Sequence, residues 1–395
     1  MLSGEGREAG GPSLTSEGSP TISGSLVKIL HLADVHLDRP FRGLQPDQAK
    51  AARLGLWETF RRSLEIARHR RVDLLTIGGD LWEQEHVSRN TVRSVAHELG
   101  RLGLPVLAIA GNHDPACPGG PYDWVEWPAN VTIARSSQPT EYRLAGASVW
   151  AVSWTGGPLH ARFLDAFRAP DDGRAHLLLL HGTCRRPDWP GEEGDAYCSF
   201  TPDQVRRAGF SACLAGHWHK AAWEDGVCYP GSPEPLGFDE EGRHCVALVE
   251  VAGAVTVELV EVAESRFLTV EVDCGGAESH AEVEQRVEAK VAGLAGPRRY
   301  LRLRLSGLLA SGCEVDTESI ERAVTPRFAA ARVEDRTRPA YDLEILARLP
   351  TVEGAFVRRL QERLLAAEGG EREVVERALE LGLASLRGDG LAHVA

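Results

Sequence analysis

Five short motifs contain the side chains of this 395-residue chain that are best suited to chemistry. They combine aspartate, asparagine and histidine, and they occur in the order Asp34-Val-His36, Gly79-Asp80, Gly111-Asn112-His113-Asp114, His181-Gly182 and Gly216-His217-Trp-His219. Imidazole, carboxylate and amide groups together suit divalent ions such as Mn²⁺, Fe or Zn²⁺. One such motif alone is weak evidence, but five in order predict a shared metal site.

The seven candidate ligands are enough for two metal ions. We expect one ion to be held by Asp34, His36 and His219, the other by Asn112, His181 and His217, with Asp80 bridging the two. Two ions roughly 3.5–4 Å apart clamp the attacking and leaving oxygens of a phosphoryl displacement. A water bridging them loses its proton near neutral pH and becomes the nucleophile. The predicted chemistry is therefore phosphoester hydrolysis.

Each of the five motifs follows a predicted strand. The apolar runs that predict these strands are residues 27–32, 72–77, 104–110, 176–180 and 212–215. Apolar residues at helical spacing predict helices over 46–69 and about 88–102, the second with Ser88 as its N-cap. This alternation indicates an α/β sheet with parallel central strands, in which ligands bind at the carboxyl ends of the strands.

The five motifs resemble the conserved blocks of the calcineurin-like metallophosphoesterases. The stretch from His31 to Leu44, and Tyr229-Pro-Gly-Ser-Pro233, resemble more narrowly the DNA repair exonucleases of the SbcD and YhaO type. The resemblance covers about residues 27–265. It implies a four-layer αββα sandwich with a smaller C-terminal α+β capping domain and terminal helices. It also implies the ligand set above with two Mn²⁺ ions, and Fe or Zn²⁺ as alternatives.

The resemblance further implies that His113 protonates the leaving group or stabilises the transition state. A histidine beside Asn112 could donate a proton to a departing 3′-oxygen, and Asp114 could orient it. Arg185 and Arg186 follow the ligand His181 closely, so we expect them to contact a phosphodiester.

The chain departs from the family pattern at one position. Some nucleases of the family have a histidine three residues after the bridging aspartate, where it helps to orient the phosphate. Here that position is Glu83, although bacterial relatives often have aspartate there. The nearby His86 is an alternative, but a plain loop histidine is the commoner case. The residue that orients the phosphate stays unassigned at this level.

Composition narrows the class of protein. The net charge is −13, which counts against nonspecific nucleic-acid binding, although a local site can still bind an anion. The eight cysteines form no CxxC pair, which argues against a zinc ribbon or a secreted disulfide scaffold and favours the cytoplasm. No apolar run approaches 18 residues, so no transmembrane helix is expected. Residues 1–25 lack the features of a signal peptide.

We expect four segments along the chain. Residues 1–25 form a disordered tail, 26–265 the metallophosphoesterase domain, 266–349 a capping and DNA-binding domain, and 350–395 the C-terminal helices. The last segment has apolar stripes at Val352, Phe356, Leu360 and Leu364, and at Val375, Leu379 and Leu383. These stripes either fold back onto the second domain or dock onto a partner.

Three functions remain open at this level. The first is a metal-dependent DNA nuclease, a 3′-to-5′ exonuclease with some endonuclease activity in DNA repair. The second is a phosphomonoesterase or small-molecule phosphodiesterase that uses the same metals, because the metal site recognises only the phosphoryl group. The third is a catalytically idle scaffold for DNA and an ATPase. The family resemblance names an SMC-like ATPase of the SbcC or YhaN kind as partner, and a homodimer is left open.

Overall fold

The computed structural model describes residues 26–157, 159–186 and 197–387, so the predicted tail lies outside the described residues. The chain divides into two compact units. Of the described residues, the first contains those up to Pro40 and those within Leu56–Glu234 and Arg243–Val262. The second contains Phe41–Gly55, Pro235–Gly242 and the chain from Ala263 onward. Two short segments that interrupt the first unit in sequence, Phe41–Gly55 and Pro235–Gly242, therefore belong to the second unit.

The first sheet of the first unit contains the first three predicted strands. Its order is β12-β11-β1-β2-β3-β4. These strands are β1 (Val27–Leu32), β2 (Leu74–Gly78), β3 (Val106–Ile109), β4 (Val131–Ile133), β11 (Cys245–Ala252) and β12 (Ala254–Glu261). Strands β1 to β4 run parallel, as predicted for the first three, and β11 pairs antiparallel with β1.

The second sheet has the order β5-β6-β7-β8-β10-β9. Its strands are β5 (Thr140–Leu144), β6 (Ala147–Val152), β7 (His176–His181), β8 (Ala212–Gly216), β9 (Ala222–Glu224) and β10 (Val227–Tyr229). Strands β6, β7, β8 and β10 run parallel. The carboxyl ends of β7 and β8 therefore lie at one edge of this sheet, which is where the motifs of His181 and His217 begin.

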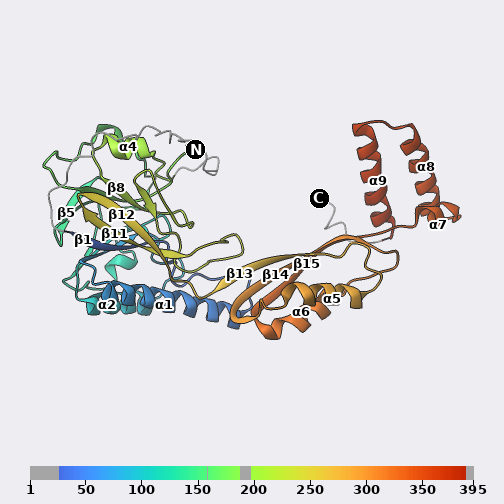
Figure 1. Ribbon diagram of the computed structural model, residues 1–395, viewed down its shortest axis with the longest axis horizontal. Coiled ribbons are helices and arrows are strands. Elements are labelled where there is room, and N and C mark those ends of the chain that lie inside the picture. The colour runs from blue at the N-terminus through green and yellow to red at the C-terminus, as the bar shows by residue number, and fades with distance from the viewer. Residues whose placement is uncertain (1–25, 158, 187–196, 388–395) are drawn as a thin grey trace, which may run out of the picture. The chain divides into compact units, whose positions relative to one another are not determined.

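The two sheets pack face to face. One apolar core contains Ile29 and Leu107 from the first sheet and Val149, Leu177 and Leu214 from the second, all fully buried. Helices α1 (Pro46–His69) and α2 (Arg89–Leu102) lie on the side of the first sheet (Figure 1). The short helices α3 (Phe163–Ala166) and α4 (Pro202–Arg207) lie on the side of the second. This arrangement confirms the predicted sandwich of two sheets with outer helices.

The second unit has a parallel three-stranded sheet of order β13-β14-β15. Its strands are β13 (Arg266–Asp273), β14 (Gly296–Leu309) and β15 (Phe328–Pro339). Helices α5 (His280–Val291) and α6 (Thr317–Val324) pack their apolar sides against one face (Figure 1). A separate C-terminal domain of helices and strands was expected, but its βαβαβ order and parallel sheet make it α/β rather than α+β.

Three helices follow this sheet. They are α7 (Leu343–Arg348), α8 (Val352–Ala366) and α9 (Gly370–Arg387) (Figure 1). Their apolar cluster contains Phe356, Leu360 and Leu364 of the first predicted stripe and Leu379 and Leu383 of the second. The two stripes therefore pack together with α7, whereas Val352 is 70% exposed. No helix in the described part of the chain is long and apolar enough to cross a membrane.

Candidate metal centre

The candidate site is built on loops that leave the carboxyl ends of parallel strands. The loop after β1 pairs with the loop after β2, because Asp34 N donates to Gly79 O (3.1 Å) and His36 N donates to Asp80 O (3.0 Å). Four predicted ligands have left-handed backbone, with φ of 54° at Asp34, 49° at His36, 51° at Asp80 and 100° at His217. Non-glycine residues rarely adopt this conformation, and it clusters at functional sites.

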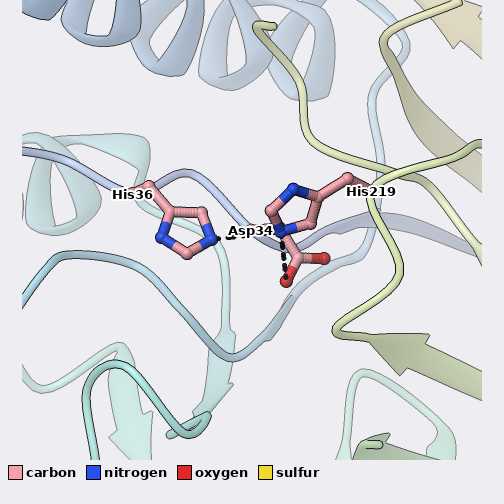
Figure 2. Close-up of side chains that lie close together, drawn as sticks. All are labelled: Asp34, His36 and His219. Carbon is pink, nitrogen blue, oxygen red and sulfur yellow. Dashed lines mark hydrogen bonds and ion pairs between the residues drawn. The ribbon is translucent and has the colours of Figure 1, made fainter. Parts of the chain in front are cut away.

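Asp34, His36 and His219 lie together, as the first ion's ligand set requires (Figure 2). The Nε2 atoms of His36 and His219 are 3.2 Å apart, and His219 Nε2 is 3.9 Å from Asp34 Oδ1. Asp34 is fully buried, and its carboxylate accepts a hydrogen bond from His217 N at 2.9 Å. The backbone of one predicted ligand thus holds the carboxylate of another in place.

Asn112, His181 and His217 form the second group. The Oδ1 atom of Asn112 lies 3.0 Å from both His181 Nε2 and His217 Nδ1. The other nitrogen of His181, Nδ1, lies 2.8 Å from the carbonyl of Gly78 and donates to it, so Nε2 is the nitrogen that faces the site. These three residues come from three separate loops.

Asp80 lies between the two groups. Its Oδ2 is 3.3 Å from His181 Nε2 and 3.7 Å from His36 Nε2. Its Oδ1 accepts a hydrogen bond from His113 N at 2.8 Å. One carboxylate oxygen is therefore close to an imidazole of each predicted set, which is the position that a bridging ligand needs.

Electrostatics favour a charged Asp80. Burial alone would raise the pKa of this carboxyl, but the charge and hydrogen bond of His181, together with His36 and His113, outweigh burial and lower it. Burial lowers the pKa of His181, yet the charge of Asp80 raises it to about 9. The buried carboxylate therefore attracts positive charge, which bound cations would supply.

The residues present fit a pair of divalent ions. Imidazole nitrogens and carboxylate oxygens lie within 4.8 Å of one another in two sets that share Asp34, namely Asp34–His36–His219 and Asp34–Asp80–His181. The donors are nitrogen and oxygen, which suits Mn²⁺, Fe or Zn²⁺ rather than a thiolate-selected metal. All eight cysteines, each within the described residues, are free thiols.

Glu83 connects the site to His113. Its Oε1 lies 3.0 Å from His36 Nδ1 and 3.1 Å from Arg39 Nη1, and its Oε2 lies 2.9 Å from His113 Nδ1. The hydrogen bond to Glu83 raises the pKa of His113. Burial works against ionisation of Glu83, but its bonds to His113 and His36 lower its pKa. Glu83 thus holds one candidate ligand and the candidate proton donor with a single carboxylate.

The structure corrects the role expected of Asp114. Its carboxylate accepts hydrogen bonds from Gly111 N, Leu81 N and the hydroxyl of Tyr122 at 2.6–2.7 Å, and from Asp80 N at 3.1 Å. Burial, followed by the charge of Asp80, raises the pKa of Asp114 to about 7. Asp114 therefore ties the loops after β2 and β3 together, and Glu83 takes the place next to His113.

The structure also separates the two arginines expected at the phosphate. Arg186 is only 5% exposed, and its guanidinium pairs with the carboxylates of Glu224 and Asp225 and donates to the carbonyl of Glu224. These contacts hold the Arg186 side chain against the turn between β9 and β10. Arg185 is exposed and its backbone N donates to Phe200 O at 2.7 Å. Arg186 is thus already paired with two carboxylates, and the contact of Arg186 with a phosphodiester, like that of Arg185, stays a prediction.

Two aromatic residues near the site, Trp154 and Tyr197, were not expected from the sequence. The Nε1 atom of the buried Trp154 donates to the carbonyl of His181 at 3.0 Å. The exposed ring of Tyr197 lies between Trp154 and His217, with both centroid distances at 5.6 Å. Nothing in their local sequence marks these side chains, because strand and loop order alone bring them to the site. His86 is exposed, and its backbone N donates to Glu83 O.

Comparison with known proteins agrees with this geometry. Residues 27–221 match the calcineurin-like phosphoesterase family. The chain is 30% identical over 276 residues to the uncharacterized metallophosphoesterase YhaO of Bacillus subtilis, covering 66% of each chain. It is 28% identical over 298 residues to the DNA double-strand break repair protein Mre11 of Methanopyrus kandleri, covering 66% of this chain and 62% of Mre11.

The chain thus spans about two thirds of the length of these curated relatives. Among solved structures, it is similar to TT1561 of Thermus thermophilus, with 12% identity, a TM-score of 0.37, and coverage of 60% of this chain and all of that one. From the family match and the two relatives, we conclude that residues 27–221 form a calcineurin-like metallophosphoesterase domain, a family that hydrolyses phosphoester bonds with paired divalent metal ions.

Proposed function

We propose that this protein is a metal-dependent nuclease that hydrolyses phosphodiester bonds in DNA, as a 3′-to-5′ exonuclease with some endonuclease activity in DNA repair. The observation that supports this most is the position of Asp80 between two groups of nitrogen and oxygen ligands, with His113 beside them. The similarity to a protein named for double-strand break repair favours DNA over a small phosphoester as the substrate.

In this proposal, separate residues of the chain bind the metal ions and donate the proton. Asp34, His36 and His219 would hold one ion, Asn112, His181 and His217 the other, and Asp80 both. Bound divalent ions, for which we propose Mn²⁺, supply Lewis-acid activation of the phosphoryl group and of water. Glu83 accepts from Nδ1 of His113, so the opposite nitrogen, Nε2, is left to donate a proton to the leaving oxygen.

A direct test compares two substrate classes under the same conditions. The full chain with Mn²⁺ is assayed on labelled duplex DNA and on para-nitrophenyl phosphate mono- and diesters. We expect DNA hydrolysis that His217→Ala and Asp80→Asn abolish, with the fold kept by circular dichroism. Hydrolysis of the small esters alone would make the protein a phosphomonoesterase or small-molecule phosphodiesterase. No hydrolysis despite two bound metal equivalents would favour the idle scaffold.

We also propose that the helical region binds an SMC-like ATPase of the SbcC or YhaN kind. Most residues of the predicted stripes pack against each other. The docking surface must therefore use Val352, the stripe residue that stays exposed, together with apolar residues outside the stripes. Ile345 (58% exposed) lies on α7, Leu349 (40%) follows that helix directly, and Val352 (70%) begins α8. Three apolar side chains exposed within eight residues are a candidate for partner contact.

A further inference from the structure

The residue that orients the phosphate has no assignment from the motifs, because Glu83 stands where some nucleases of the family have a histidine. The structure shows what this carboxylate does instead. Each of its oxygens already faces an imidazole, His36 Nδ1 on Oε1 and His113 Nδ1 on Oε2. The Nη1 atom of Arg39 also donates to Oε1, at 3.1 Å. The carboxylate therefore places a cation beside the candidate metal ligands.

The backbone of Arg39 is held firmly. Its N–H donates to the carbonyl of His36 at 3.1 Å. The preceding residue, Asp38, has a left-handed φ of 62° and accepts hydrogen bonds from Ser88 N (3.0 Å) and Thr91 Oγ1 (2.6 Å) at the beginning of α2. A side chain that begins from such a fixed point loses less conformational entropy when it binds a ligand.

The side chain of Arg39 still has donors to offer. It is 32% exposed, and Glu83 is the partner found for it among the residues that the structure describes. A guanidinium has five N–H donors in a planar fork that matches two phosphate oxygens. Arg186 contrasts with it, because it is almost fully buried between two carboxylates. Of these two arginines, Arg39 is the one arranged to bind an anion at the site.

We propose that Arg39 binds the substrate's phosphate group beside the metal centre, as the phosphate-orienting residue that the motifs leave unassigned. This inference rests on the proposed function and deepens it. The ligand class is a phosphate monoester, phosphodiester or free phosphate, all of which present non-bridging oxygens to the fork. Glu83 then serves to aim Arg39 as well as His113.

The test uses inorganic phosphate as the probe and the full chain loaded with Mn²⁺. Titration calorimetry gives the phosphate Kd of wild type, Arg39→Gln and Arg39→Lys, and steady-state assays give KM and kcat. We expect Arg39→Gln to raise Kd and KM roughly 10- to 100-fold, the usual loss for charge-assisted hydrogen bonds, with kcat within about threefold. Arg39→Lys should recover part of this loss, because it keeps the charge without the fork.

Arg70→Gln is the matched control. Arg70 is also half-exposed and pairs with one carboxylate, Glu258, at 2.9 Å, but it lies directly after the C-terminal end of α1. We expect its phosphate Kd to equal that of wild type. An unchanged Kd in Arg39→Gln with full metal content overturns the proposal. So does a loss confined to kcat on poor leaving groups, because Arg39 would then only support Glu83.

Failure of the proposed function would look different. If the wild type hydrolyses no DNA but binds phosphate, the nuclease assignment falls, whereas the comparison of phosphate Kd between wild type and Arg39→Gln still decides the role of Arg39.

Discussion

His113 is the side chain at which proton transfer can be separated from metal binding. Its Nδ1 is held by Glu83, and its ring lies 4.9 Å from that of His36. We expect His113→Ala to lower kcat roughly 10²- to 10⁴-fold on an unactivated phosphodiester, the usual contribution of a positioned proton donor. Para-nitrophenyl esters should be affected much less, because para-nitrophenolate leaves without being protonated. Equal losses on both substrates, or wild-type turnover on DNA, would remove His113 from the proton-transfer step.

His31 is a buried residue outside the predicted ligand set, and its ionisation affects folding. It connects the two sheets, with Nδ1 3.0 Å from Thr76 Oγ1 and Nε2 3.2 Å from Ala215 O. Burial lowers its pKa from 6.5 to about 4. Between these values the unfolded chain binds a proton that the folded chain does not, so the free energy of unfolding falls as the pH falls.

The expected slope from His31 is about 1.4 kcal/mol per pH unit between pH 6.5 and 4. Urea unfolding of wild type and His31→Asn across this range measures it, and the variant should lack that part of the slope even if it is less stable overall. His69→Asn, at an exposed position, is the control. Parallel curves for wild type and His31→Asn would show that the pKa of His31 is the same in the folded and the unfolded chain.

At the scale of the elements, the site depends on how closely the strand ends approach. Gly111 follows β3, and a Cβ there would overlap Asp80 Oδ1 and lie 2.7 Å from His181 Cε1. We expect Gly111→Ala to fold but to bind less than one metal equivalent tightly, because it displaces the bridging carboxylate. Metal analysis after dialysis measures the loss. Gly237→Ala, where nothing lies within 4 Å, should keep full metal content; two tightly bound equivalents in Gly111→Ala would contradict this account.

Helices and strands with a strong local pattern were predictable. The helix over 46–69 agrees with α1 at both ends, and Ser88 caps α2 by accepting from Thr91 N at 3.1 Å, because both features depend on local spacing and side-chain chemistry. Strand β15 was not predicted. Its pattern mixes alanine and charged residues, and Glu334 is paired there with Arg304 of β14 at 3.0 Å. This segment forms a strand because it pairs with the neighbouring strand β14, and its own sequence pattern does not predict one.

At the scale of the whole molecule, the helical region should be separable. The core of α7, α8 and α9 contains Leu346, Val357, Leu379 and Leu383, whereas the sheet of the second unit has its own core around Leu303. We expect a chain that ends at Ala340 to stay folded, to keep Mn²⁺-dependent hydrolysis of short DNA, and to lose co-purification with the SMC-like ATPase. Thermal unfolding, nuclease assays and pull-down measure these outcomes.

The position of the cut matters. A chain that ends at residue 350 keeps α7 but removes α8 and α9, so Leu346 loses its partners, and we expect that chain to aggregate more than the one ending at Ala340. A chain ending at Ala340 that still binds the ATPase at full affinity would contradict the docking proposal. Unfolding of the whole chain on this truncation would show that the helices stabilise the rest of the molecule.

The sequence by itself determined which side chains could meet and at which edge of the sheets. Parallel strands that end in Asp34, Asp80, Asn112 and His181 deliver these groups to one side, because successive crossovers give the strands one direction. Only the tertiary structure decided which hydrogen-bond and ion-pair partners the side chains around these ligands have. It gave His113 to Glu83 rather than to Asp114, and it buried Arg186 against Glu224 while leaving Arg39 half-exposed. Such choices depend on distances between loops that are far apart in sequence, and no local spacing records those distances.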